Sequence, residues 1–444
     1  MRTLTTETVN QIGQEVVLKG WVNARRNMGK IVFLDLRDRG GIVQVVGVPA
    51  ELDEQSQEKL KSVRPEWVVE IRGIVNERGA KQKNPEMPTG NVEILAKEIK
   101  VLSEAEPLPL DLEDEKIGMD VYLDYLPLTL RTERGRGIFK VQETIIQSFR
   151  EALMLENFTE FQSPALVGGD AEGGSAVFKV DYFYDQKAYL ATSPQLYKQI
   201  MTGVFERVFT TAKIFRAEKS NTARHLSEVV QMDFEMGFIN DQYDVMAMLE
   251  KVIKHIVSRV GEKHADVFKQ RGVALPLIPA KFPILKLHEA QDILGVPHSS
   301  DTDPEQERLI CEWAKKEHAS DFVFITHFPT AARAWYTYEE PGEAPLSRGF
   351  DLLFRGLEIN SGAQRVHNYD DLVARIKGRG LDPEKFAFYL QAFKYGMPPH
   401  GGCSTGLERI TARMLEIPNV KEAVLFPRDL NRIDLQLSPP DNKL

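Results

Sequence analysis

The sequence Phe215-Arg216-Ala217-Glu218 decides the fold, together with Arg224-His225 and Asp233-Phe234-Glu235 downstream of it. The first string ends a β-rich run over residues 208–216, and a second run over 229–238 follows a polar connection. Arg216 and Glu218 are two residues apart, so they share one face of a strand. On one face they can hold a phosphate and a nucleobase amine, whereas an exposed ion pair is the plainer alternative. The stretch predicts two strands joined by a loop that could close over phosphates.

The regions on both sides of this stretch mix strands and helices unevenly. Apolar residues at helical spacing from Gly137 predict a long amphipathic helix that runs to about Glu156. Further patterns predict strands at 188–192, 321–328 and 349–359, and helices at 195–202, 242–260, 370–379 and 383–394. Regular βαβ alternation, G-x-G-x-x-G and G-x-x-x-x-G-K-[ST] are all missing, which argues against a Rossmann or P-loop site. Residues 131–444 are therefore predicted to form an α+β domain on a largely antiparallel sheet.

Two more segments of this domain carry candidate ligands. Asp351, Glu358 and Ser361 offer oxygen atoms that suit magnesium better than zinc, although spacing alone does not distinguish them from ordinary surface residues. Residues 401–406, Gly-Gly-Cys-Ser-Thr-Gly, are rich in glycine, which would let a ligand approach closely, although the segment alone favours a plain glycine-rich turn. A helix is predicted to begin near Gly406, which places Arg409 where it could meet a phosphate.

The first hundred residues have a different character. Three β-rich runs, a polar helical segment and two more runs predict a five-stranded barrel of the oligonucleotide-binding (OB) type over residues 1–103. Such barrels bind single strands by stacking bases on aromatic rings beside basic side chains. Phe33, Arg26 and Gln44 are the candidates, with a core position as the alternative for Phe33. Prolines and acids in residues 104–130 predict a hinge between the two domains.

Composition limits the remaining possibilities. The formal net charge of −9 argues weakly against a nucleic-acid partner, but the first 103 residues hold slightly more basic than acidic side chains. Two cysteines cannot build a disulfide framework or a zinc site. No apolar stretch reaches 18 residues, and the first residues lack the pattern of a secretory signal. We therefore expect a cytoplasmic protein.

Taken together and in order, these segments resemble the three signature motifs of the class II aminoacyl-tRNA synthetases. The first motif matches the long helix and residues 161–164, the second matches residues 215–225, and the third matches Gly406-Leu407-Glu408-Arg409. The resemblance covers nearly the whole chain, and the barrel is similar to the family's anticodon-binding domain. It implies ATP and tRNA as substrates, Mg²⁺ as cofactor, and a homodimer built through the first motif.

More specific strings resemble the aspartyl branch of this class, in its compact archaeal-type form. In Ser193-Pro194-Gln195-Leu196-Tyr197-Lys198, the lysine is implied to pair with the side-chain carboxylate of the substrate aspartate. Arg365 is implied to grip the same carboxylate, and leaving two buried cations unpaired would select against asparagine. Glu172, in a mobile loop, and Asp233 are implied partners of the substrate's ammonium group, and Gln195 belongs to the same amino-acid pocket.

The resemblance also assigns the remaining roles. Arg216 is implied to be the catalytic contact to the α-phosphate, and Glu218 to bind the adenine amino group. The γ-phosphate end of ATP is implied to meet Arg224, His225 and Arg409, and Asp351, Glu358 and Ser361 are implied to carry magnesium, with Glu358 also on ATP. Phe33 is implied to stack on an anticodon base, with Arg26 and Gln44 at base edges. One departure concerns residues 401–406, where compact relatives usually have Gly-Gly-Phe-Gly-Leu-Gly.

Several alternatives stay open. An asparaginyl-tRNA synthetase is the nearest, although such relatives usually lack the lysine found at position 198. An asparagine-forming relative typically has no barrel, and a catalytically inactive RNA-binding protein would not need the charged residues of the motifs. Some compact members charge both tRNA-Asp and tRNA-Asn, so the sequence leaves the range of tRNAs undecided.

Overall fold

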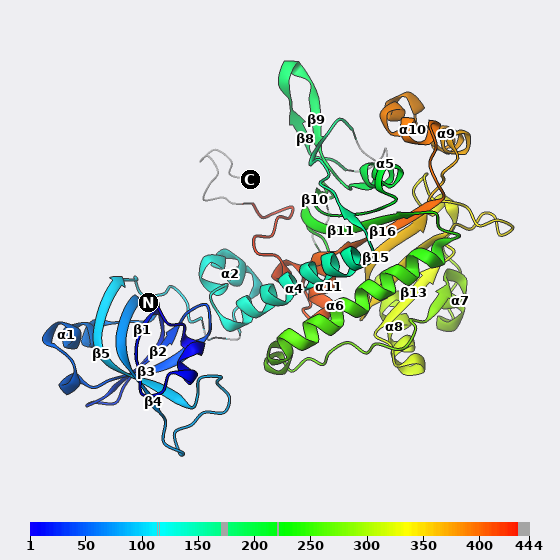
Figure 1. Ribbon diagram of the computed structural model, residues 1–444. Coiled ribbons are helices and arrows are strands. Elements are labelled where there is room, and N and C mark those ends of the chain that lie inside the picture. The colour runs from blue at the N-terminus through cyan, green and yellow to red at the C-terminus, as the bar shows by residue number, and fades with distance from the viewer. Residues whose placement is uncertain (113, 115, 170–175, 220–221, 434–444) are drawn as a thin grey trace. The chain divides into compact units, whose positions relative to one another are not determined.

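The computed structural model describes residues 1–112, 114, 116–169, 176–219 and 222–433 (Figure 1). The chain divides into two compact units, Met1–Asp111 and Leu112–Leu444. Each unit has a hydrophobic core of its own. Within the described residues, no helix is both long enough and apolar enough to cross a membrane.

The first unit is a closed five-stranded barrel with the strand order β1-β2-β3-β5-β4, which confirms the predicted OB-type fold. Its elements are β1 (Glu15–Asn27), β2 (Val32–Arg37), β3 (Ile42–Gly47), α1 (Glu54–Ser62), β4 (Val68–Glu77) and β5 (Val92–Ser103). Side chains alternate between the core and the outer surface along each strand, as a half-buried sheet requires. On β2, for example, Leu34 and Leu36 are fully buried, while the alternating residues Phe33 and Asp35 are partly exposed.

The second unit is built on an eight-stranded sheet with the order β12-β13-β14-β15-β16-β11-β10-β6. Neighbouring strands from β13 to β10 run antiparallel. At the two edges, β12 pairs in parallel with β13, and β6 pairs in parallel with β10. The strands are β6 (Thr159–Glu160), β10 (Arg207–Phe215), β11 (Glu228–Gly237), β12 (Ile284–Lys286), β13 (Phe322–Thr326), β14 (Gly349–Phe354), β15 (Leu357–Gln364) and β16 (His400–Gly406). A small separate sheet contains β7 (Leu166–Val167), β8 (Lys179–Asp181) and β9 (Lys187–Leu190). This confirms the predicted α+β domain.

Two long helices, α4 (Glu133–Leu155) and α6 (Gln242–Arg271), lie along each other and cover one face of this sheet (Figure 1). The predicted apolar stripe of α4 is buried, and Thr132 caps its first turn by accepting from the backbone of Gly135. The other helices are α2 (Met119–Asp124), α3 (Leu126–Thr129), α5 (Gln195–Phe205), α7 (Leu287–Leu294), α8 (Pro304–His318), α9 (Tyr369–Gly378), α10 (Ala387–Lys394) and α11 (Leu407–Met414). Short 3-10 turns lie at Thr5–Asn10, Pro49–Glu51, Phe183–Asp185, Thr330–Ala332, Pro383–Phe386 and Val420–Ala423.

The strand register separates an apolar from a polar face of the sheet. One row across four strands contains Phe234, Cys403, Gly362 and Phe350, and its three larger side chains belong to the core beneath α4 and α6. The adjacent row contains Asp233, Ser404, Ser361 and Asp351. Since neighbouring residues on a strand point to opposite faces, this second row gathers polar groups on the face away from the two helices.

Two predictions about local structure are wrong. Residues 401–406 form most of the central strand β16 rather than a turn. Their glycines are needed for close packing, because a Cβ on Gly402 would lie 2.1 Å from the carbonyl oxygen of Phe234 and 2.2 Å from Oε2 of Glu235. Residues 349–359 are not one strand but parts of β14 and β15, which turn back at Arg355 and Gly356. Both turn residues have positive φ angles, 45° and 79°, as a tight hairpin requires.

Candidate active site

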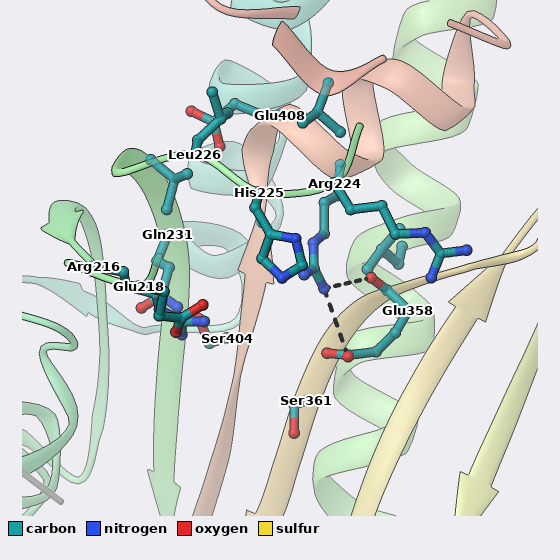
Figure 2. Close-up of a pocket in the computed structure, with 15 residues that line it drawn as sticks. Arg216, Glu218, Arg224, His225, Leu226, Gln231, Glu358, Ser361, Ser404 and Glu408 are labelled. Atoms are coloured by element: carbon teal, nitrogen blue, oxygen red, sulfur yellow. Dashed lines mark hydrogen bonds and ion pairs between the residues drawn. The ribbon is translucent and has the colours of Figure 1, made fainter. Parts of the chain in front are cut away.

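A cavity of about 180 Å³ opens on the polar face of the sheet, between the ends of β10, β11 and β15 and the start of α11. It brings together most residues for which a role toward ATP is expected (Figure 2). The lining includes Arg216, Glu218, Arg224, His225, Glu358, Ser361 and Arg409. The first and the last of these residues, Arg216 and Arg409, are far apart in the sequence, so the sheet brings distant segments of the second unit together at the cavity.

Arg216 and Glu218 stand free at one side of this cavity (Figure 2). They directly follow β10, and the backbone of Arg216 is fixed by donating to the carbonyl of Ser227 at 2.9 Å. Both side chains are exposed. Neither forms a hydrogen bond or an ion pair with another residue in the part of the chain that the structure describes. Their charges are therefore available to a ligand.

The opposite side of the cavity is held together by internal contacts. Arg224 donates through Nη1 to Oε2 of Glu307 at 3.1 Å and through Nη2 to the carbonyl of Gly356 at 3.2 Å. The same Glu307 oxygen accepts from the backbone N–H of Glu358 at 2.9 Å. Arg409 donates to the carbonyl of Glu358 at 2.9 Å and lies 3.5 Å from its carboxylate (Figure 2). Glu307, which no sequence pattern singled out, thus fixes the positions of Arg224 and Glu358.

His225 and Glu408 complete the wall near the second and third motifs. Nδ1 of His225 lies 2.7 Å from Oγ1 of Thr222, which orients the ring. Glu408 is almost fully buried and accepts from the backbone N–H of Val230 at 3.0 Å. Burial raises the pKa of Glu408 to about 7, although its backbone hydrogen bonds oppose the shift.

The three residues expected to carry magnesium lie on the neighbouring strands β14 and β15, but two of them, Asp351 and Ser361, accept hydrogen bonds from Arg333. Arg333 donates to both carboxylate oxygens of Asp351, at 3.1 and 2.5 Å, and to Oγ of Ser361 at 3.3 Å. Burial, together with the charge of Asp351, raises the pKa of Glu358 to about 7. Among the described residues no group of three or more His, Cys, Asp or Glu side chains is arranged to hold a metal ion.

Two carboxylates and a hydroxyl still fit one hard cation when a nucleotide is present. Such a cation would relieve the repulsion between Asp351 and Glu358 that raises the pKa of Glu358. Magnesium usually takes only one or two carboxylates from a protein and completes its shell with water and substrate phosphates. The donor set therefore fits Mg²⁺ better than a metal that needs a full cage of protein ligands.

A second group of charges is enclosed in the protein. Nζ of Lys198 lies 2.8 Å from Oδ2 of Asp233 and 3.4 Å from Oε2 of Glu235. Arg365 donates to both oxygens of Glu235, from Nε at 2.9 Å and from Nη2 at 3.3 Å. These four side chains are at most 5% exposed. Buried charges require partners, and here two cations balance two anions.

The electrostatics of this network leave one donor unused. Burial works against ionisation of Glu235, but Arg365 and Lys198 still hold its pKa below the usual value. Nη2 of Arg365 also donates to the carbonyl of Gly402 at 2.9 Å. Within the described chain, Nη1 of Arg365 has no hydrogen-bond partner, so it is free to meet an anion. Glu235 was given no role from sequence, although its place two residues after Asp233 puts both on one face.

Ser404 and Gln195 lie at the edge of this charged network. Oγ of Ser404 donates to Oδ1 of Asp233 at 2.8 Å, and Ser404 also lines the cavity, so it connects the two groups. Cys403, in contrast, points into the core. Gln195 is on the same buried face of α5 as Lys198 but bonds to Gln199 rather than to the charges. Glu172 lies outside the described residues.

In the barrel, the three expected contact residues form one outward-facing cluster. Arg26 is directly opposite Phe33 in the register of β1 and β2. Arg26 also pairs with both oxygens of Asp35, at 2.7 and 3.0 Å, and donates to Oε1 of Gln44 at 3.3 Å. The amide of Gln44 donates to Glu93 at 3.1 Å. Phe33 is partly exposed beside these polar groups, as a base-stacking ring would be.

Comparison with known proteins agrees with this geometry. Residues 118–430 match the family model of class II tRNA synthetases (D, K and N), and residues 16–102 match an OB-fold nucleic acid binding domain. The aspartate–tRNA(Asp/Asn) ligase of Thermus thermophilus is 44% identical over 440 residues, covering 98% of this chain and all of the relative. The aspartate–tRNA(Asp) ligase of Thermococcus kodakarensis is 39% identical, with 96% and 97% covered.

Solved structures extend the likeness to the whole architecture. The asparaginyl-tRNA synthetase of Pyrococcus horikoshii complexed with asparaginyl-adenylate superposes with a TM-score of 0.90 at 32% identity, covering 98% of this chain and 99% of the other. A putative aspartyl-tRNA synthetase of Leishmania major gives a TM-score of 0.88 at 28% identity, with 97% and 94% covered. The chain belongs to the class II aminoacyl-tRNA synthetases, within the family of aspartate–tRNA ligases.

Proposed function

We propose that this chain activates L-aspartate with ATP and transfers it to tRNA by way of aspartyl-adenylate. The observation that carries the proposal is the buried network of Lys198 and Arg365 with their carboxylate partners, next to a cavity with free charges. The side-chain carboxylate of aspartate would join Lys198 and the unused Nη1 of Arg365. Asparagine has one carbonyl acceptor in place of two carboxylate oxygens, so one of these two donors would face its NH₂ group without a hydrogen bond, which is the main cost that a polar pocket can impose on a near-isosteric substrate.

In the first step, an α-carboxylate oxygen of aspartate attacks the α-phosphorus of ATP. The new bond is the mixed anhydride, the bond between the α-phosphorus and its bridging oxygen breaks, and pyrophosphate leaves with the electron pair. The attacking group is already an anion, so the protein needs neither a nucleophile nor a strong base. Arg216 would bind the α-phosphate and stabilise the charge that develops there, while Glu218 would accept from the adenine amine.

In the second step, a terminal ribose hydroxyl of the tRNA attacks the acyl carbon and loses its proton, while the bond between that carbon and the phosphate oxygen breaks and AMP leaves with the electron pair. Arg224, His225 and Arg409 would position the far end of the nucleotide in the first step, before pyrophosphate departs. Glu358, with Ser361 and Asp351, would hold Mg²⁺, which neutralises phosphate charge when it is bound. Asp233 and Gln195 would bind the ammonium group of aspartate, and Glu172 would be a third contact to the same group.

The barrel would bind the anticodon through stacking on Phe33 and hydrogen bonds from Arg26 and Gln44. Charging of both tRNA-Asp and tRNA-Asn is favoured by the similarity to the aspartate–tRNA(Asp/Asn) ligases of Thermus thermophilus and Deinococcus radiodurans, which are 44% and 41% identical to this chain. We include a homodimer in the proposal, because Met154 and Leu155 leave large apolar side chains exposed at the end of α4, the helix of the first motif. We also propose that the protein is cytoplasmic, because ATP and free tRNA are found there.

Charging assays test this proposal. Transcripts of tRNA-Asp and tRNA-Asn would be incubated with labelled aspartate or asparagine, ATP and magnesium. We expect aspartate on both transcripts and asparagine on neither. Aspartate on tRNA-Asp alone would remove the dual specificity and keep the enzyme assignment. Asparagine on tRNA-Asn would favour the asparaginyl alternative, and a lack of charging with any amino acid would favour a binding protein that has lost catalysis.

A further inference from the structure

Four buried polar side chains form a continuous hydrogen-bonded chain, and only one of them, Gln195, has a role in the proposed reaction. Gln195 and Gln199 come from α5, Tyr389 from α10, and His400 from the start of β16. None is more than 4% exposed. Nε2 of Gln195 lies 3.0 Å from Oε1 of Gln199, and the Tyr389 hydroxyl lies 3.3 Å from the same oxygen. Nε2 of Gln199 lies 3.0 Å from Nε2 of His400, whose Nδ1 lies 2.9 Å from the carbonyl of Pro398.

The Pro398 carbonyl fixes the direction of every bond in this chain. A carbonyl oxygen only accepts, so Nδ1 of His400 must carry the proton. Burial lowers the pKa of His400 to about 4, so the ring is neutral and its Nε2 is an acceptor. Gln199 must then present its NH₂ group to His400 and its oxygen to Gln195 and Tyr389. Burial also raises the pKa of Tyr389 well above its usual value, which keeps this hydroxyl protonated as a donor.

The last member of the chain is left with a defined orientation. The NH₂ group of Gln195 is used by Gln199, so its Oε1 must point away from Gln199. Within the described residues, no group donates to Oε1 of Gln195. Gln195 lies three residues before Lys198 on the buried face of α5, so the two side chains are neighbours on that face. The free oxygen is therefore carried by the same buried face of α5 as Lys198.

We propose that Gln199 and His400 are positioning residues that hold the Gln195 amide with its oxygen toward the ammonium group of the amino-acid substrate. The inference rests on the proposed function, because it assigns the source of orientation within the proposed aspartate pocket. An amide is nearly symmetrical in shape, so without the chain the NH₂ end could take the place of the oxygen. The NH₂ end would then face the ammonium with the wrong sign of charge.

Two substitutions of Gln199 separate orientation from packing. Gln199→Met keeps the length of the side chain but gives Gln195 no acceptor, so its amide can turn. Gln199→Glu keeps an acceptor for Gln195, and His400 can take up a proton to pair with the new carboxylate while still donating to Pro398. Tyr389→Phe is the matched control, because it removes one donor to the Gln199 oxygen and leaves the bond from Gln195 in place.

The readout compares L-aspartate with succinate, which has both carboxylates and lacks the ammonium group. We expect Gln199→Met to raise the KM for aspartate in ATP–pyrophosphate exchange by about tenfold or more, as loss of a hydrogen bond to a charged group implies. The inhibition constant of succinate and the KM for ATP should stay within about twofold. Gln199→Glu and Tyr389→Phe should keep the KM for aspartate within about threefold of the wild-type value.

Equal losses for aspartate and succinate in Gln199→Met would show a packing role and overturn the proposal, as would an unchanged KM for aspartate. If Gln199→Met does not fold, as judged by circular dichroism, Gln199→Ala takes its place with the same expected pattern. Wild-type exchange is measured separately and tests the proposed function itself. If the wild type used another amino acid, the same test would compare the KM for that amino acid with the inhibition constant of its counterpart without the amino group. This comparison would still decide the role of Gln199.

Discussion

The two ends of the candidate active site differ in whether their charged side chains already have partners in the protein. At the amino-acid end, Lys198 and Arg365 are buried and already paired with Asp233 and Glu235. At the nucleotide end, Arg216 is exposed and unpaired among the described residues, so water solvates it until a ligand arrives. Buried pairs make an unmatched substrate costly and so favour selection. A free cation costs little at rest and gives its full attraction to the transition state.

The largest expected effect is at the unpaired end. Arg216→Ala should lower aspartate-dependent ATP–pyrophosphate exchange by about 1,000-fold, as expected for removal of one group that stabilises developing charge. The fold should persist, because the exposed Arg216 side chain forms no hydrogen bond or ion pair in the described part of the chain. Lys213→Ala, on β10 just before Arg216, is the control, since the pair of Lys213 with Glu228 is largely exposed and its loss should change exchange by less than about twofold. Exchange within tenfold of wild type in Arg216→Ala would remove Arg216 from the mechanism.

At the paired end, a substitution should affect stability as well as substrate use. Lys198→Leu should raise the KM for aspartate by about 100-fold, and it should perturb ATP binding far less. It should also cost about 3–5 kcal/mol of unfolding free energy, because Asp233 and Glu235 lose a buried partner. Exchange kinetics at varied aspartate, ATP calorimetry and urea denaturation measure the three quantities. Unchanged aspartate kinetics would mean that Lys198 does not select the substrate.

Magnesium should depend unequally on the two acids near the nucleotide. Glu358→Gln should raise the magnesium concentration for half-maximal exchange by about tenfold, since it removes the acid that has no bidentate arginine partner. Asp351→Asn should raise it by about threefold, because Arg333 already holds that carboxylate. A magnesium titration of each variant provides the test. The reverse order would mean that Asp351 is the main ligand and that Arg333 releases it when nucleotide binds.

The last prediction concerns stability alone and involves Glu408, a buried acid that forms no ion pair within the described residues. Its folded-state pKa of about 7 lies above the unfolded value of 4.5, so its contribution to stability is full below pH 4.5 and is lost as pH rises through 7. Glu408→Gln should therefore be more stable than wild type at pH 8, by about 2–3 kcal/mol at most. The difference should shrink toward pH 5. Thermal denaturation across this range measures it, and a difference independent of pH would contradict the raised pKa.

Local patterns predicted the elements well wherever one face of a helix or strand is consistently apolar. The barrel strands and the long helix α4 follow from such patterns. The same patterns predicted that Arg216 and Glu218 lie beside one cavity. Strand β16 was missed because glycine usually marks a turn, and only tertiary packing against Glu235 explains it here. Helix α8 has no counterpart among the predicted elements, although Asp303 before Pro304 is a good helix start.

The contacts that complete the site depend on residues far apart in sequence. Glu307 supports Arg224 from 83 residues away, and Arg365 reaches Glu235 across 130 residues. The direction of the Gln199 amide depends on His400, which is 201 residues further along. No pattern within a single element contains this information. The sequence could name most of the groups that would face the substrates, but the residues that hold them in place required the fold.

The central claim is that the buried cations select aspartate for activation at the neighbouring cavity. ATP–pyrophosphate exchange with magnesium and without tRNA, measured across the standard amino acids, tests it most directly. The account predicts exchange with aspartate alone. Exchange with asparagine would contradict the role given to Lys198 and Arg365, and no exchange with any amino acid would contradict the enzymatic function as a whole.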